Sequence, residues 1–251
     1  AWALFCAAAA GDLVRTQSML DRDPSLVNAQ YWYQFPLHMA VREGHADVVQ
    51  MLIERGADPG QSRYQYNSRD KMREAASERG HRATLRLFEA AMHERFGFSA
   101  EFAAVSDAER ERDTAQVGRL LQSQPELARA ADALGNSGLH WSALTRQPAL
   151  IDLFLNHGAD INARRGDGQT PLHVSINGDY WYRWNQLPPE AISNPWTITG
   201  YLLGKGADYD FHTTCAMGDG ETVARALQAT PALANRLSAH NQSPLYFAAR
   251  F

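Results

Sequence analysis

The 251-residue sequence predicts an all-α protein made of stacked pairs of antiparallel helices. One segment recurs along the chain: FPLHMAVREGHADVVQMLIERGADP begins at Phe35, SGLHWSALTRQPALIDLFLNHGADINA at Ser137, and TPLHVSINGD at Thr170. Its histidine returns after 102 residues, which is three periods of 34, and then again after 33. Periods of this length are typical of supersecondary units that stack on one continuous core.

Each unit shows the same order of signals, which indicates a helix, a short turn, a second helix and a polar loop. Pro36 and Pro171 occupy the first helical position, where a missing N–H costs nothing. Glycines such as Gly44 can end the first helix, while Gly158 and Gly206 can end the second in the left-handed conformation. Apolar residues at helical spacing fill the segment between them.

These signals predict a single elongated domain over residues 1–251, with about seven repeats and a truncated eighth. The first, fourth and seventh repeats replace the Gly-Ala-Asp ending with a proline form, as in DRDPSLVN. Because the chain begins without Met and stops inside a repeat opening, we expect a segment of a longer protein. The predicted repeats cover residues 1–30, 31–63, 64–98, 99–134, 135–166, 167–210 and 211–241.

Repeat six is longer than the others. Pro171 to Ala207 spans 36 residues, whereas the equivalent stretch in repeat two spans 21, so 15 extra residues lie between its helices. We place this insertion at about residues 179–196. It is rich in Tyr and Trp, and two interpretations stay open: the rings bury themselves on the neighbouring helices, or some remain exposed and anchor a partner.

Charge and hydropathy exclude several classes of function. The formal net charge is −4 and no block of like charges stands out, so the sequence carries no electrostatic signature of nucleic-acid binding. No run approaches the roughly 18 apolar residues of a spanning helix, so we expect no membrane insertion. We further expect a monomer that is cytoplasmic rather than secreted.

The sequence also offers no catalytic or cofactor chemistry. The recurring histidines occupy equivalent positions in different repeats, about 10 Å apart in adjacent copies, so they cannot share one zinc ion. Zinc-ligand spacings, a complete phosphate loop and a nucleophile elbow are all missing. We therefore expect that the chain binds no metal and no cofactor and is not an enzyme.

The charged stretch DAERERD, residues 107–113, is predicted to be a solvated turn between helices.

The P-L-H and G-A-D motifs give the chain a resemblance to the ankyrin-repeat family over essentially its whole length. The resemblance implies a curved stack of helix pairs with hairpin-like loops on one side. It also implies that the histidine helps to tie the hairpin to the start of the first helix. Members of the family usually bind other proteins along the concave face formed by hairpins and first helices.

The resemblance places the candidate partner-binding residues in two early hairpin tips, one later hairpin and the insertion. Three aromatic residues in a row at a hairpin tip cannot all face one core, so some of them are expected on the surface. The predicted residues are Tyr31, Trp32, Tyr33, Tyr64, Tyr66, Arg164, Arg165, Tyr182 and Trp184.

The function expected from the sequence is a non-enzymatic module that presents this surface to a partner protein of unknown identity. Two alternatives remain open. The aromatic insertion could bind a small ligand or a saccharide, or the chain could be a regulatory segment of a larger enzyme or channel.

Overall fold

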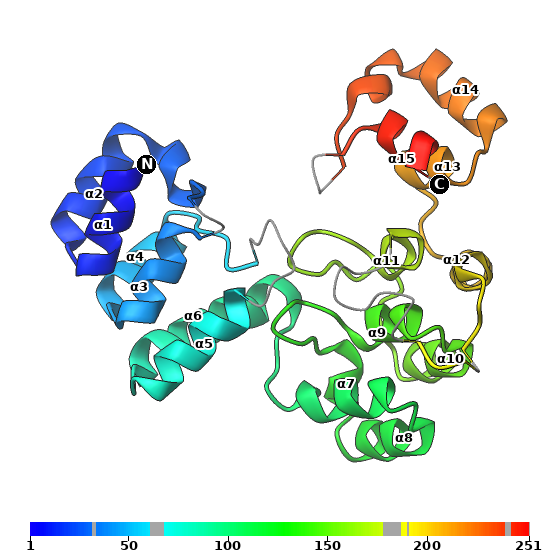
Figure 1. Ribbon diagram of the computed structural model, residues 1–251, viewed down its shortest axis with the longest axis horizontal. Coiled ribbons are helices and arrows are strands. Elements are labelled where there is room, and N and C mark those ends of the chain that lie inside the picture. The colour runs from blue at the N-terminus through cyan, green and yellow to red at the C-terminus, as the bar shows by residue number, and fades with distance from the viewer. Residues whose placement is uncertain (32–33, 61–67, 178–186, 190, 239–241, 251) are drawn as a thin grey trace. The chain divides into compact units, whose positions relative to one another are not determined.

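The structure is a computed structural model that describes residues 1–31, 34–60, 68–177, 187–189, 191–238 and 242–250 (Figure 1). The described residues form helices joined by short loops, and their only β-type pairings are isolated bridges between Tyr31 and Gln34 and between Phe98 and Ala131. The predicted all-α fold class is therefore confirmed.

The helices follow one another in antiparallel pairs, and one pair falls within each of the seven predicted repeat ranges. A last helix, α15, opens a further unit. The pairs are α1 (Trp2–Ala10) with α2 (Leu13–Arg22), α3 (Pro36–Glu43) with α4 (Ala46–Glu54), α5 (Ser68–Glu78) with α6 (Arg82–Phe96), α7 (Phe102–Arg110) with α8 (Thr114–Ser123), α9 (Gly138–Leu144) with α10 (Pro148–Asn156), α11 (Pro171–Asn177) with α12 (Pro195–Gly204), and α13 (Phe211–Ala216) with α14 (Gly220–Ala229), followed by α15 (Pro244–Arg250).

The chain divides into two compact units, residues 1–103 with 130–136 and residues 104–129 with 137–251. The single domain predicted over residues 1–251 stays a prediction. In the first unit, whose helices are drawn in blue to cyan in Figure 1, α3 packs between α1 and α5, while α4 packs between α2 and α6. First helices and second helices thus form two layers.

Small residues allow the layers of the first unit to approach closely. Ala40 on α3 and Ala76 on α5 are fully buried in its core. Opposite them, α4 turns Val48, Val49 and Leu52 inward at helical spacing, and all three are buried. The apolar periodicity of the sequence thus becomes one continuous core that runs through successive repeats.

In the second unit, α9 packs against both α10 and α11, and α13 packs against both α14 and α15. Close packing leaves no room for a side chain at Gly138, the first residue of α9. A β-carbon there would lie 2.1 Å from Cζ of Phe154, a buried residue of α10. The glycine that replaces the usual proline of the repeat is therefore required by the aromatic ring beneath it.

The proline endings of repeats one, four and seven have a structural counterpart. In each, a short 3₁₀ helix follows the second α-helix, namely η1 (Pro24–Asn28), η2 (Pro125–Arg129) and η4 (Pro231–Asn235). The same three repeats begin their second helix with an aspartate whose carboxylate accepts a backbone N–H three residues later, at Asp12, Asp113 and Asp219. In these three repeats the second helix therefore begins with the same kind of aspartate cap and is followed by the same kind of 3₁₀ helix.

The segment between α11 and α12 runs over residues 178–194, so the insertion predicted at about residues 179–196 ends before Pro195. Trp196, which we expected in the loop, belongs to α12 and packs half-buried against the core around Ile176 and Cys215. The helix begins early because Pro195 is its first residue and the Asn194 side chain accepts the N–H of Trp196.

The end of this insertion that the structure describes is held down by the preceding repeat. One guanidinium nitrogen of Arg146 donates hydrogen bonds to the carbonyls of Ile192, at 2.8 Å, and Ser193, at 2.6 Å. Ala191 is buried beside them. The Tyr and Trp rings of the insertion before Pro195 lie outside the described residues, so both interpretations of these rings stay open.

The solvated turn predicted at residues 107–113 is wrong for Glu109. Helix α7 continues through Arg110, and Glu109 is 0% exposed because it faces α9. Its carboxylate accepts a hydrogen bond from the Ser142 hydroxyl at 2.9 Å, and its carbonyl accepts one from the Gln147 amide at 2.8 Å. The charge pattern alone gave no sign that Ser142 lies opposite.

Replacing Gly206 by Val should lower the free energy of unfolding by at least about 1 kcal/mol, because a β-branched residue is strained at positive φ. Gly206 follows α12 with φ of 94°, and a β-carbon there would meet no atom within 4 Å, so the cost comes from the backbone alone. Urea unfolding followed by circular dichroism measures it.

The matched control is Gly200→Ala inside α12, where a β-carbon would likewise meet no atom within 4 Å. That change should raise stability by about 0.5–1 kcal/mol, since alanine is the better helix former. Equal effects of the two substitutions would contradict the assigned helix end.

Candidate partner-binding surface

The first hairpin is closed by two backbone hydrogen bonds between Tyr31 and Gln34. The N–H of Tyr31 donates to the carbonyl of Gln34 at 3.0 Å, and the N–H of Gln34 donates back to Tyr31 at 2.9 Å. This pairing fixes the backbone of Tyr31 next to the first helix of repeat one.

An aromatic cluster joins this hairpin to α1. The ring of Tyr31 lies 4.8 Å from that of Trp2 and meets the ring of Phe5 edge-on at 6.0 Å. Phe5 is buried, whereas Trp2 is 59% exposed and Tyr31 is 43% exposed. Phe5 thus supports a pair of rings that stay open to solvent on a hairpin and a first helix.

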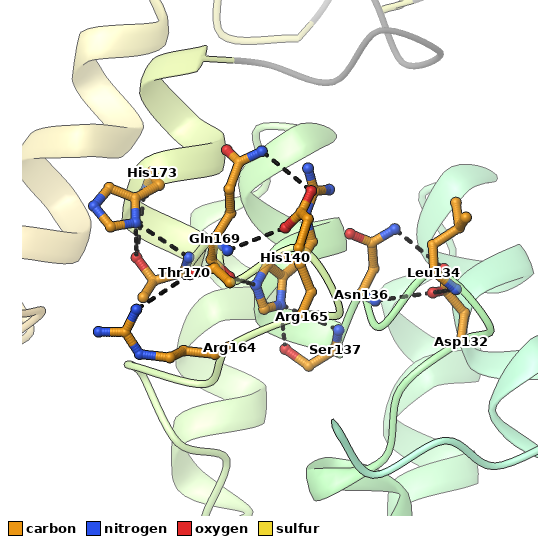
Figure 2. A network of polar contacts seen from close by, with 12 residues as sticks. Asp132, Leu134, Asn136, Ser137, His140, Arg164, Arg165, Gln169, Thr170 and His173 are labelled. Carbon is orange, nitrogen blue, oxygen red and sulfur yellow. Dashed lines mark hydrogen bonds and ion pairs between the residues drawn. The ribbon is translucent and has the colours of Figure 1, made fainter. Parts of the chain in front are cut away.

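In the second unit, histidines tie each hairpin to a first helix, as the resemblance implied (Figure 2). Nδ1 of His140 accepts the backbone N–H of Ser137 at 3.1 Å, so its proton lies on Nε2 and is donated to the carbonyl of Gln169 at 3.0 Å. His212 contacts the carbonyl of Arg236 in the same way, at 2.8 Å. One imidazole therefore links the start of its own helix to the next hairpin.

His140 is fully buried, which fixes its protonation state. Burial, followed by the positive charge of Arg165, lowers the pKa of His140 to about 3. The ring is therefore neutral at physiological pH. Only the neutral ring can accept the N–H of Ser137 and donate to Gln169 at once, so burial and hydrogen bonding favour the same tautomer.

Turns of similar construction shape the two hairpins in Figure 2. Asp132 accepts the backbone N–H groups of Leu134 and Asn136, both at 2.8 Å. In the later hairpin Asp167 accepts the N–H of Gln169 at 3.0 Å. At each tip an aspartate side chain therefore accepts backbone N–H groups that have no backbone acceptor within the tight turn.

The prediction that Arg165 lies on the binding surface is wrong. Its side chain is 1% exposed, because its Nε donates to the carboxylate of Asp167 at 3.0 Å inside the hairpin. Arg164, its neighbour, is exposed, and one of its guanidinium nitrogens donates to the carbonyl of Gly168 at 3.2 Å. Two adjacent arginines thus have opposite environments.

Repeat six departs from the histidine pattern. Nδ1 of His173 accepts the N–H of Thr170 at 3.3 Å, but Nε2 donates at 2.9 Å to the carboxylate of Asp210 instead of to a backbone carbonyl. Although burial by itself raises the pKa of Asp210, hydrogen bonds from His173 and from the N–H of Thr213 hold it well below its usual range. Asp210 is therefore ionised.

A pocket of about 210 Å³ opens beside this pair, between the successive hairpins of the second unit. Arg164 and Arg236 lie at its polar side, while Phe211, Leu237 and Phe247 contribute apolar surface. Figure 2 shows Arg164 on the same side of its hairpin as Thr170 and His173. The sequence analysis did not predict this pocket, because its residues come from separate loops and from the helices α11, α13 and α15.

The structure leaves most of the predicted aromatic sites undescribed. Tyr31 is exposed at the first hairpin, and Arg164 borders the pocket. Trp2 was not predicted, since nothing near it in the sequence shows that it faces Tyr31. The predicted residues outside the described part of the chain are Trp32, Tyr33, Tyr64, Tyr66, Tyr182 and Trp184.

Comparison with known families identifies the repeat. The family model described as "Ankyrin repeat" matches residues 33–63 and 134–165, which hold the α3–α4 pair and most of the α9–α10 repeat with its hairpins. The two matched stretches are ankyrin repeats. The resemblance stated from the P-L-H and G-A-D motifs is thereby confirmed, and the paired helices agree with it.

Relatives of known identity match only part of this ankyrin-repeat chain. "Protein phosphatase 1 regulatory subunit 27" of Homo sapiens is 30% identical over 101 residues, which is 40% of this chain and 56% of the relative. "Probable E3 ubiquitin-protein ligase XBOS32" of Oryza sativa subsp. japonica is 34% identical over 87 residues, 34% of this chain and 18% of the relative. The chain therefore spans little more than half of the first relative and less than a fifth of the second.

Among solved structures, the ankyrin repeat domain of Bcl-3 is similar to this chain at 20% identity, with a TM-score of 0.35 over 98% of this chain and 92% of that one.

Within the part of the chain that the structure describes, every helix is too short or too polar to cross a bilayer. The same residues contain no group of three or more His, Cys, Asp or Glu side chains placed to hold a metal ion.

Lowering the pH should destabilise the second unit through His140. Between about pH 6.5 and pH 3 the unfolded chain binds a proton at this residue that the folded chain does not bind, so the free energy of unfolding falls as the pH falls. The loss from this group should reach about 2 kcal/mol at pH 5, relative to pH 8. Urea unfolding at several pH values measures it.

The variant His140→Gln isolates this contribution. It will be less stable at pH 8, but its unfolding free energy should fall less steeply toward pH 5 than that of the original chain. Parallel pH profiles for the two proteins would show that His140 is not kept neutral by its surroundings.

Proposed function

We propose that this chain is a non-enzymatic protein-binding module that contacts its partner through hairpins and first helices. The observation that carries the proposal is the exposed ring pair of Tyr31 and Trp2, one on a hairpin and the other on a first helix. The ankyrin repeats support it, because this family usually binds proteins along that surface.

The geometry of the pair suits an interface. Exposed Trp and Tyr residues cover large areas with few rotatable bonds, and they dominate the energetics of many protein interfaces. Phe5 packs behind Tyr31, and the two backbone hydrogen bonds to Gln34 hold the residue in place. A partner would therefore meet rings that lose little conformational freedom on binding.

A second function, the regulatory segment of a larger enzyme, is favoured by the partial coverage of the relatives. One relative is named as a phosphatase regulatory subunit and another as a ubiquitin ligase, and the chain covers 56% and 18% of their lengths. A binding module within a larger assembly would fit either name. Ligand or saccharide binding by the insertion depends on Tyr182 and Trp184, outside the described residues, and stays a prediction.

Selection of peptides from a displayed random library, followed by calorimetry, tests the proposed surface. For a selected peptide, Tyr31→Ala and Trp2→Ala should each weaken binding about tenfold or more, which corresponds to about 1.4 kcal/mol. Trp2 is 59% exposed, so Trp2→Ala should leave the thermal midpoint of unfolding nearly unchanged, whereas Tyr31→Ala should lower it slightly because it also removes a ring contact with buried Phe5.

Val14→Ala is the matched control. Val14 is a 78% exposed apolar residue on the second helix of the same repeat, so it tests exposed apolar surface outside the proposed interface. Its loss should change affinity less than about twofold. The proposal fails if selected partners are insensitive to Tyr31 and Trp2, or if Val14→Ala weakens binding equally.

A further inference from the structure

The pocket between the hairpins of the second unit carries more positive than negative charge. Arg164 and Arg236 are exposed at its edge, and Asp210 is the one carboxylate among the described residues that line it. The guanidinium of Arg236 has no hydrogen bond or ion pair among the described residues, while its carbonyl is engaged by His212. A cationic group therefore remains available at this edge.

The carboxylate of Asp210 is already satisfied. One oxygen accepts the Nε2 proton of His173, and the other accepts the backbone N–H of Thr213 at the start of α13. An incoming cation would have to compete with both partners and approach two arginines. An incoming anion meets two guanidiniums, each of which presents several N–H donors in a planar fork.

The remaining wall of the pocket is apolar. Phe247 is buried at the pocket, Phe211 is half-buried, and Leu237 stays exposed beside Arg236. A ligand that fits both sides must therefore combine a negative group with an adjacent apolar group. A ligand that consisted only of a charged group would leave the apolar wall exposed to solvent.

Size separates the possible ligands. Sites for drug-sized molecules and cofactors enclose about 300–1,000 Å³, and this pocket has about 210 Å³. The pocket lies between successive hairpins of one unit, on the kind of surface that the proposed function assigns to a partner polypeptide. The volume suits one or two side chains of such a segment better than a whole small molecule.

We propose that this pocket binds a carboxylate side chain of a partner polypeptide, with a neighbouring apolar side chain of that partner on Phe211 and Leu237. The inference rests on the proposed function in that the occupant belongs to a protein partner. Arg164 and Arg236 bind the carboxylate, and the pocket therefore selects acidic segments that carry an apolar residue beside Glu or Asp.

Three small probes test the pocket without the natural partner: acetyl-Leu-Glu-amide, acetyl-Leu-Gln-amide and acetyl-Leu-Lys-amide. Titrated into the ¹⁵N-labelled chain, the Glu probe should shift the backbone amide signals of Gly168, Leu237 and Ser238 in a saturable manner. It should bind about fivefold more tightly than the Gln probe at low ionic strength, and salt should reduce this preference.

Substitutions then assign the preference to the two arginines. The double variant Arg164→Gln with Arg236→Gln should bind the Glu and Gln probes equally within about twofold, since it lacks the charge that distinguishes them. Arg225→Gln is the matched control, because Arg225 is an exposed arginine on α14 outside the pocket. It should keep the full preference, and neither variant should change the thermal midpoint of unfolding appreciably.

Equal binding of the Glu and Gln probes to the original chain would overturn the inference, as would tighter binding of the Lys probe or signal shifts confined to residues outside the pocket. Absence of saturable binding by the Glu probe would overturn it as well. These outcomes are independent of Tyr31 and Trp2, which lie in the first unit. A failed pocket is thus distinguishable from a failed binding module.

Discussion

The hydrogen bonds of buried histidines to the next hairpin are the interaction on which the candidate surface of the second unit depends. His140 joins the start of α9 to Gln169, and His212 joins α13 to Arg236. A hairpin without such an anchor would consist of backbone with few partners of its own. The hydrogen bond fixes the backbone of the hairpin relative to the first helix. The hairpin tips can therefore present their side chains in a fixed arrangement.

Repeat six shows how a small change in this interaction creates a possible site. His173 donates to the carboxylate of Asp210 where His140 donates to a backbone carbonyl. The hairpin remains attached to the helix. The partly exposed His173–Asp210 pair now lines a pocket together with Arg164 and Arg236. A contact that serves stability in one repeat thereby shapes the surface chemistry of another.

Buried polar groups lie in a hairpin and between first helices of the second unit. Arg165 pairs with Asp167 inside a turn, and Glu109 accepts a hydrogen bond from Ser142 between α7 and α9. Polar and charged groups are costly to bury unless they are hydrogen-bonded, so each must have its partner in place when the chain folds. The contact of Glu109 thus depends on the correct stacking of neighbouring repeats, whereas the Arg165–Asp167 pair forms within one turn.

Local physical rules determined much of the fold from the sequence alone. Proline at the first helical position, glycine at positive φ after the helix and apolar residues at helical spacing act within a few residues of chain. Pro36, Gly44 and Gly206 therefore marked helix ends that the structure confirms. The repeat period and the shared histidine followed from the same local motifs.

Contacts between distant residues were decided only by the tertiary structure. The exposure of Arg164 and the burial of Arg165 depend on which side of the hairpin each residue occupies, and no sequence spacing distinguishes two neighbours in a turn. Trp2 meets Tyr31 across 29 positions of sequence, and the pocket joins residues from separate loops and helices. Such sites arise where repeats pack against one another, so the sequence of a single repeat does not contain them.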